Sequence, residues 1–423
     1  MKQNQITTFS TIFEALFSEQ QLNSLGVQTH MIERFRLITP AKLCLAFVCA
    51  LGSGNARTIA DIHRYFNHLH SMSVRLKPFH NQLVKLGTPE FMRQVFEQAL
   101  ALHLPAMHTF SDAYRGHFKQ VLLQDGTSFA VHDGLSLHFP GRFSTHSPAA
   151  VELHVTYDLE KAQPVRVSLS EDTASERDYL PVAQSLRGCL LMADAGYFSK
   201  AYIESLQNEA ASFVLRMPAS VNPMATCNQT GLCQPLRSWL AVLPKHGELD
   251  LDVQWPDGPV YRCVLFASTD HKDKPVCLCT NLDRHTFPAA TVGEWYRLRW
   301  QIELLFKEWK SLNSLNKFNT EYSTIAETLI WGSLLAATLK RWLINGAQQK
   351  YRRVLSMFSG AKTANQWWLP FCIKWACSGI TEIAAELGKV FAFLAEHCQR
   401  VNVKRDQKSG AFKVLEITYE SWC

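Results

Sequence analysis

The spacing of apolar positions changes twice along the chain. Residues 1–117 place apolar side chains at helical spacing, for example over 43–51, with no convincing run that alternates apolar and polar positions. From residue 119 to about 280, short apolar runs are separated by turn residues, a pattern typical of β-strands. Helical spacing then returns over 291–311 and 323–344 and in the C-terminal part. The pattern predicts an α/β chain with helical segments on both sides of a sheet.

The sheet region divides into a core and an inserted part. Strands are predicted at 120–125, 128–131, 151–157 and 165–169, followed by a helix at 176–186 and a buried strand at 188–193. Three meandering strands, a helix and a strand are the order of a ribonuclease-H-like sheet. A second β-rich stretch, at 213–280, is interpreted as an insertion. The predicted fold is therefore a ribonuclease-H-like α/β core interrupted by a β-rich insertion and flanked by helical domains. The boundaries are 1–117 (helical, DNA-binding), 118–204 and 286–345 (core), 205–285 (insertion), and 346–423 (helical, for DNA contacts or dimerisation).

A pair of short helices is predicted within the first 117 residues. One helix spans 58–66, a turn follows at 71–73, and a second helix spans 78–83 with a proline at its first position. The pair resembles a helix-turn-helix, in which Arg75 and Lys77 would contact DNA. An ordinary helical hairpin with a solvated polar face fits the same pattern.

Length and charge narrow the possible classes of protein. The 423 residues exceed the roughly 250–300 that a single core usually holds, so two to four folding units are expected. Residues 1–117 carry 11 Lys or Arg against 7 Asp or Glu, residues 346–423 carry 11 against 6, and the middle carries 21 against 24. Basic flanks around a slightly acidic centre favour a protein that grips a polyanion and collects carboxylates for metal ions.

Two other classes of protein are disfavoured. No run of about 20 apolar residues could cross a bilayer, and the first residues carry no secretory signal, so a cytoplasmic protein without a membrane partner is expected. The 12 cysteines are scattered, which favours reduced thiols. Their spacing at Cys227/Cys233 and Cys277/Cys279 does not suit structural zinc, and no zinc site is predicted.

The most informative segment is 296–310, read as a helix with about 100° of rotation per residue. One narrow stripe then holds a tyrosine and four charged residues, namely Tyr296, Arg299, Glu303, Lys307 and Lys310. The opposite side is apolar and would anchor the helix. Glu308 lies off the stripe and is expected to be exposed and to tolerate alanine. Taken alone, the stripe also fits a solvated helix face with a Glu303–Lys307 pair.

The spacing Tyr-x2-Arg-x3-Glu-x6-Lys, at 296, 299, 303 and 310, resembles the signature of the insertion-sequence-four family of bacterial DDE transposases. The residues around Asp125 and Asp194 resemble the first and second catalytic aspartates of that family. The resemblance extends over about residues 120–337. It implies a transposase that binds the terminal inverted repeats of an insertion sequence, cleaves the ends and joins the 3′-OH to target DNA.

The resemblance assigns catalysis and metal binding to Asp125, Asp194 and Glu303, and DNA contact to Tyr296, Arg299, Lys307 and Lys310. The implied partner is double-stranded DNA, both transposon ends and target. The resemblance also implies a bacterial, nucleoid-associated protein. A homodimer of this protein would hold the DNA in the synaptic complex. Members of the family cut through a hairpin intermediate and hold a flipped base on an aromatic side chain, for which Trp239 and Trp255 are candidates here.

Chemistry supports these residue types independently. In-line displacement at a phosphodiester needs charge neutralised on the attacking and leaving oxygens, which two Mg²⁺ ions about 3.5–4 Å apart supply. Mg²⁺ takes few protein ligands and prefers carboxylate oxygens, so three Asp or Glu residues suffice, with Mn²⁺ as the expected substitute. Asp133, Asp158 and Asp172 compete for the triad. Asp125 is preferred because the first strand is predicted to end there.

Two other functions remain open. A structure-specific nuclease or Holliday-junction resolvase on the same fold would cut DNA without rejoining it. A domesticated transposase would only bind DNA, and it would usually have lost one carboxylate of the triad. Joining of a 3′-OH to a second DNA separates a transposase from a nuclease, and dependence on Mg²⁺ separates either enzyme from a binding protein.

Overall fold

The computed structural model describes residues 15–56, 58–102, 106–143, 145–244, 247–256, 258–267, 275–312, 319–377, 380–400 and 414–417. Its helices are α2 (Glu19–Gln28), α3 (Pro40–Ser53), α4 (Ile59–Leu69), α5 (Leu76–Leu83), α6 (Gly87–Leu100), α7 (Lys200–Asn208), α8 (Leu236–Ala241), α9 (Ala289–Arg297), α10 (Trp300–Leu312), α11 (Ser323–Tyr351), α12 (Met357–Lys362), α13 (Ala364–Cys377) and α14 (Ile380–His397). Within these residues, no helix combines the length and apolar character that a membrane span requires.

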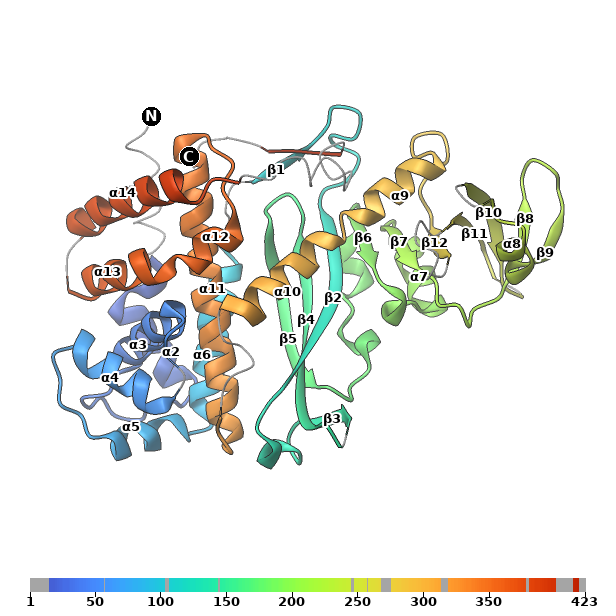
Figure 1. Cartoon of the computed structure of the whole chain (residues 1–423). Helices are drawn as coiled ribbons and strands as arrows, with labels where there is room; N and C mark the ends of the chain where they lie inside the picture. Colours follow the sequence, from blue (N-terminus) through green and yellow to red (C-terminus); the bar gives the residue numbers. More distant parts are fainter. Residues whose placement is uncertain are drawn as a thin grey trace.

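The strands are β1 (His108–Phe110), β2 (Val121–Ala130), β3 (Pro140–Phe143), β4 (Ser147–Asp158), β5 (Gln163–Glu171), β6 (Leu190–Ala193), β7 (Ser212–Arg216), β8 (Met224–Cys227), β9 (Cys233–Pro235), β10 (Glu248–Gln254), β11 (Val260–Phe266), β12 (Val276–Thr280) and β13 (Leu415–Ile417). Four 3₁₀ turns complete the chain: η1 (Asp133–Leu135), η2 (Glu176–Tyr179), η3 (Ala183–Leu186) and η4 (Ala195–Tyr197). Most helices gather at one end of the molecule, and the sheet extends away from them (Figure 1).

A mixed sheet forms the centre of the protein, which confirms the α/β prediction. Its strand order is β3-β4-β2-β6-β7-β12-β11-β10-β8-β9, with β5 paired to β4. The predicted meander is present, because β2 and β5 both pair antiparallel with β4. Strands β6 and β7 then run parallel to β2. The carboxyl ends of β2, β6 and β7 therefore point toward the same edge of the sheet.

Three local predictions were wrong. The strands predicted at 120–125 and 128–131 form the single strand β2, because Gly126 continues the ladder opposite His154 instead of turning. The helix predicted at 176–186 is replaced by η2 and η3, since Pro181 forces Leu180 into an extended conformation. Helix α5 begins at Leu76, two residues before the predicted proline, because the whole first turn of a helix has free N–H groups and tolerates proline.

The segment predicted as an insertion continues the core sheet. Strand β12 pairs antiparallel with β7, and β11, β10, β8 and β9 follow in order. The side chain of Asn281 reinforces this junction: its Oδ1 accepts from the Phe213 N–H at 3.0 Å, and its Nδ2 donates to the Ala211 carbonyl at 2.9 Å. The division into four domains stays a prediction.

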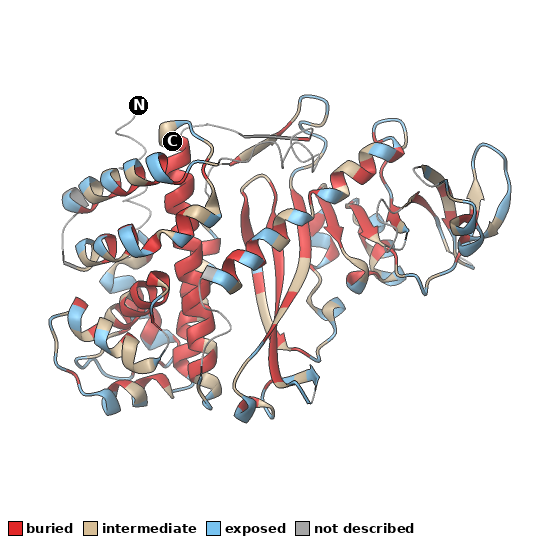
Figure 2. Cartoon of the chain, viewed as in Figure 1, coloured by how far each residue is buried: buried red, intermediate tan, exposed pale blue. Residues whose placement is uncertain are grey.

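Helix α11 is the axis of the helical part. It is buried along nearly its whole length (Figure 2) and packs against α3, α6 and α14. Glycines allow the close approach, because a Cβ at Gly332 would lie 2.9 Å from Leu51 and one at Gly346 would lie 2.7 Å from Phe391. Helices from both ends of the chain thus share one core around α11. The C-terminal part is mainly helical as predicted, and it also contributes β13, which pairs with β1.

Alternate residues of the central strands face two separate cores. Val121 and Leu123 of β2 pack with the helical part, whereas Leu122 packs on the far face beside α7. Since side chains alternate along a strand, Asp125 shares the face of Leu123. Helices α9 and α10 cross this face (Figure 1). The fold therefore sets α10 directly over the middle of β2.

Candidate active site

Two aspartates meet because their strands are neighbours. Asp125 lies in the middle of β2, and Asp194 directly follows β6. The parallel register pairs Gln124 with Ala193, so the two aspartates follow paired positions. Gly126 is required by packing rather than by a turn, since a Cβ there would lie 2.5 Å from Oε1 of Glu152. The Asp-Gly pair is thus a strand feature that places a carboxylate beside α10.

The helix predicted at 291–311 is two helices joined by a tight turn. The N–H of Leu298 donates to the Trp295 carbonyl at 2.9 Å, and the N–H of Arg299 donates to the Tyr296 carbonyl at 3.1 Å. These three-residue steps are typical of a 3₁₀ turn. Trp295 and Leu298 are fully buried beneath the joint and anchor it. The prediction of a continuous helix was wrong, yet the joint still presents Arg299 to the sheet.

Arg299 is the centre of the site. Its Nη1 donates to Oδ2 of Asp125, and its Nη2 donates to Oε1 of Glu303 at 2.5 Å. Burial lowers and the carboxylate of Asp125 raises the pKa of Arg299, and the net shift is upward. A permanently charged guanidinium therefore lies between the carboxylate from the sheet and the one from α10.

Asp194, the other aspartate, is held by Tyr296 and by a second arginine, Arg216. The phenol of Tyr296 donates to Oδ1 of Asp194 at 3.2 Å, and Nη1 of Arg216, from the end of β7, lies 3.5 Å from the same oxygen. Burial, followed by the charge of Asp194, raises the pKa of Tyr296. Arg216 was not predicted; its only signal in the sequence is a cation at the end of the strand after Asp194.

Lys310 reaches the sheet from the far end of α10. Its ammonium group donates to the backbone carbonyl of Ser128 in β2 at 2.7 Å, and burial lowers its pKa. Lys307 is exposed and lines a cavity with Glu308 and Arg341 instead. The structure therefore gathers six of the predicted residues, namely Asp125, Asp194, Tyr296, Arg299, Glu303 and Lys310. It leaves Lys307 outside this group and places Arg75 and Lys77 on the exposed surface at α5.

The ionisation of Asp125 is changed by its surroundings. Burial raises its pKa to about 6, although Arg299 and the N–H of Gly126, at 2.9 Å, oppose the shift. Two of the three competing acids, Asp158 and Asp172, accept hydrogen bonds from groups outside this site. Asp158 accepts from Gln120 at 3.0 Å, and Asp172 accepts from the backbone of Arg142 at 3.0 Å.

The residues present suit a divalent ion. Asp125, Asp194 and Glu303 offer only carboxylate oxygens, the ligands preferred by hard cations. Arg299 supplies positive charge between two of them, at the place where a bound cation would act. As placed, no three His, Cys, Asp or Glu side chains in the described part of the chain enclose a common point. A cation shared by Asp125 and Glu303 would therefore require Arg299 to move away from both carboxylates.

The prediction that Glu308 is exposed was wrong, and one of the two candidate tryptophans lies in the core. Glu308 is 3% exposed rather than solvated, and it forms an ion pair of 2.6 Å with Arg341 of α11. Trp239 belongs to the core, where its Nε1 donates to the Ala225 carbonyl at 2.9 Å. Trp255 is half-buried beside Phe198. The exposed tryptophan next to the site is Trp300, in the first turn of α10.

Comparison with known proteins defines the class. The family model described as "Transposase DDE domain" matches residues 116–339, more than half of the chain. The chain belongs to this family, and it is an enzyme of the DDE transposase class. Enzymes of this class generally use divalent metal ions.

Its relatives are transposases of insertion sequences. The transposase for insertion sequence element IS1151 from Clostridium perfringens is 20% identical, and the alignment covers 78% of each chain. The transposase for element IS231B from Bacillus thuringiensis subsp. berliner is 20% identical over 79% of each chain. Among solved structures, the piggyBac transposase synaptic complex with hairpin DNA is 11% identical, with a TM-score of 0.46, over 94% of this chain and 84% of the other.

Proposed function

We propose that this DDE transposase is a member of the insertion-sequence-four family that mobilises an insertion sequence. It binds the terminal inverted repeats, cleaves the ends and joins the 3′-OH to target DNA. Asp125, Asp194 and Glu303 would hold two Mg²⁺ ions, and a homodimer would hold the two ends together. The observation that carries the proposal is the convergence of Tyr296 and Arg299, with Glu303, on the two aspartates.

Two further observations support this function. The strand order β5-β4-β2-β6-β7, antiparallel and then parallel, agrees with a ribonuclease-H-like core. The relatives are transposases of insertion sequences, which favours a transposase over a nuclease or resolvase.

The residues around the triad would position DNA. When bound, the metal ions would neutralise charge on the attacking and leaving oxygens. Arg299, once released from Asp125 and Glu303, can donate two parallel hydrogen bonds to a phosphate. Tyr296 can turn its phenol from Asp194 to the backbone of the same strand. Lys310, fixed by Ser128, adds a charge at the far end of α10, so a DNA strand would run along α10.

A strand-transfer assay tests the function. DNA that flanks the gene would supply the donor ends, and a labelled plasmid would be the target. Joined products that require Mg²⁺ or Mn²⁺ are expected; cleavage without joining would favour the nuclease, and metal-independent binding alone would favour a DNA-binding protein. Point variants are preferable to removal of residues 1–117, because α3 and α6 bury one side of α11.

Lys310→Ala and Lys307→Ala should separate the two lysines of α10. Each variant should lower the salt slope of DNA binding by about one unit, because each loses one phosphate contact. Only Lys310→Ala should also slow cleavage, by about 100-fold, since its ammonium group lies against β2 beside the triad. Cleavage rates and binding at several salt concentrations would check this. Equal slowing by both variants would contradict the assignment of Lys310 to the cleavage site.

Binding of Mn²⁺ should depend on pH through Asp125. The pKa of this carboxyl is raised to about 6, so below pH 6 a proton occupies it and must leave before a cation binds. The apparent affinity for Mn²⁺ should fall about tenfold per pH unit below 6 and change little above 7. Electron paramagnetic resonance of free Mn²⁺ would measure it. An affinity that is constant between pH 5 and pH 7 would exclude Asp125 as a ligand.

A further inference from the structure

The loop between α2 and α3 has a fixed base. Met31 and Ile32 are buried, and Nε2 of Gln82 in α5 donates to the Met31 carbonyl at 2.8 Å. Gly87, at the start of α6, lets the loop pack closely, because a Cβ there would lie 2.3 Å from the Thr29 carbonyl. The loop is therefore attached to the second helix of the proposed helix-turn-helix.

The tip of this loop exposes five consecutive residues, Glu33-Arg34-Phe35-Arg36-Leu37. The side chains of Phe35 and Leu37 are 60% and 65% exposed. A large aromatic side chain in water costs free energy unless something covers it. Phe35 lies between two arginines in the sequence, and Leu37 lines the neighbouring cleft together with apolar side chains such as Ile38 and Leu86. Charged and apolar groups therefore occur together at the tip, which indicates a charged partner with an apolar component.

A cleft of about 1090 Å³ lies between the tip and α5. Four cations line it, namely Arg34, Arg36, Arg75 and Lys85, against one carboxylate, Glu33. None of the four cations forms an ion pair with a residue in the described part of the chain. A cleft with three more positive than negative side chains is suited to a polyanion.

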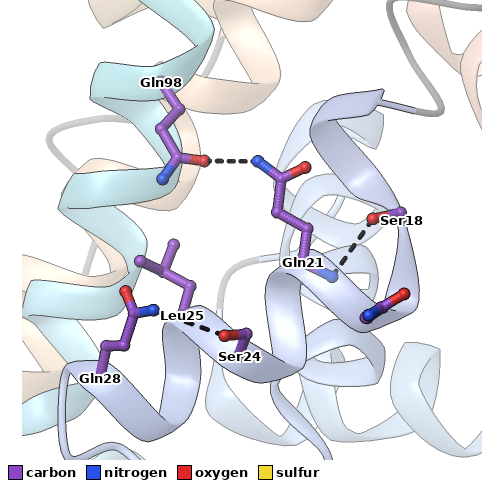
Figure 3. A pocket seen from close by; sticks show the side chains of 7 residues that line it. Ser18, Gln21, Ser24, Leu25, Gln28 and Gln98 are labelled. Carbon is purple, nitrogen blue, oxygen red and sulfur yellow. Dashed lines mark hydrogen bonds between the residues drawn. The ribbon is translucent and has the colours of Figure 1, made fainter.

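The cleft differs from a second cavity in the helical part. That cavity, between α2 and α6, is lined by one leucine and by serines and glutamines, and its amides bond to neighbouring side chains (Figure 3). Gln21 donates to Gln98 at 3.1 Å, and Gln28 donates to Ser24 at 3.4 Å. It carries no charge and offers nothing to a phosphate.

We propose that residues 33–37 and α5 form a cleft that binds the DNA backbone. Arg34 and Arg36 contact phosphates from within the cleft. Phe35, which lies at the exposed tip and does not line the cleft, packs against the sugars and base edges of the adjoining minor groove. The inference rests on the proposed function. It extends the DNA contacts predicted at α5, Arg75 and Lys77, to the neighbouring loop. The rings of His80 in α5 and Tyr322 have centroids 5.3 Å apart, so α5 packs against the start of α11.

Fluorescence anisotropy with a labelled 30-bp duplex of random sequence would test the cleft. Arg34→Ala and Arg36→Ala should each lower the salt slope by about one unit and weaken binding about tenfold at 0.1 M salt. Phe35→Ala should weaken binding about tenfold with an unchanged salt slope, because it removes contact area but no charge. All three side chains are exposed, so the variants should unfold at the wild-type temperature.

Two matched controls lie in the sheet part, outside the segments predicted to contact DNA. Arg187→Ala removes one exposed positive charge between η3 and β6, and Phe143→Ala removes an aromatic ring of β3 that is 66% exposed. Neither should change the affinity by more than about twofold, and both should keep the wild-type salt slope.

Three results distinguish the outcomes. Unchanged affinity and salt slope in Arg34→Ala, Arg36→Ala and Phe35→Ala would overturn the proposal. Unchanged DNA binding with loss of self-association would also overturn it, and would make the loop a contact between copies of the chain. If both arginine variants have reduced salt slopes but the wild-type protein fails to join DNA, the cleft is supported and the transposition mechanism is rejected, so the two failures are separable.

Discussion

Replacing Asp125 with asparagine is expected to abolish cleavage of transposon-end DNA and leave its binding nearly unchanged. The exchange preserves the size of the side chain and an oxygen that accepts from Arg299, and it removes only the negative charge. Divalent ions contribute several kcal/mol to phosphoryl chemistry, so the loss of one ligand should slow cleavage at least about 1,000-fold. Asp194→Asn and Glu303→Gln should act alike, because each removes the charge of another carboxylate proposed to hold the metal ions.

Asp133→Asn is the matched control for this prediction. Asp133 is exposed in η1, and it undergoes the same change of charge away from Arg299. Its cleavage rate should stay within about twofold of wild type. Single-turnover cleavage and anisotropy measured on the same DNA separate chemistry from binding. A triad variant that cleaves at near-wild-type rate in Mg²⁺ would remove that residue from the triad, and an inactive Asp133→Asn would make Asp133 its replacement.

The residues of the site could be predicted because their spacing is local. A helix repeats every 3.6 residues, so Glu303 and Lys310 had to share one face of α10, and the tight turn before α10 keeps Arg299 within hydrogen-bonding distance of Glu303. The meander of β2, β4 and β5 was predictable for the same reason, since alternating polarity and turns are readable over short windows. The spacing could not decide whether these side chains face solvent or contact the carboxylates of Asp125 and Asp194.

Features that depend on distant parts of the chain were not predictable. The break between α9 and α10 depends on Trp295 and Leu298 packing beneath it, on residues far away in sequence. The continuity of the sheet depends on β12 pairing with β7, where Leu278 lies opposite Arg216. Lys307 shared the predicted stripe, but α10 turns that position to solvent once Ile302 and Trp309 are buried.

Glu308 is the clearest case of a wrong prediction from helical spacing, because the spacing predicted an exposed residue and the structure buries it. Alanine at this position is expected to destabilise the protein by about 3–5 kcal/mol, since it leaves the Arg341 guanidinium buried without a countercharge. Arg341 would keep its hydrogen bond of 2.9 Å to the Ala162 carbonyl, which cannot neutralise it. The midpoint of unfolding in urea should therefore fall clearly below that of the wild type.

The double variant Glu308→Leu/Arg341→Met tests the cause. Removing both charges together avoids an unpaired ion, so this protein should be much more stable than Glu308→Ala and close to wild type. Lys307→Ala, at the adjacent exposed position, is the control and should shift the unfolding free energy by no more than about 0.5 kcal/mol. A double variant as unstable as Glu308→Ala would mean that lost packing, not the unpaired arginine, is responsible. Since Arg341 joins α11 to α10, the same loss of stability should lower cleavage only at temperatures where Glu308→Ala begins to unfold.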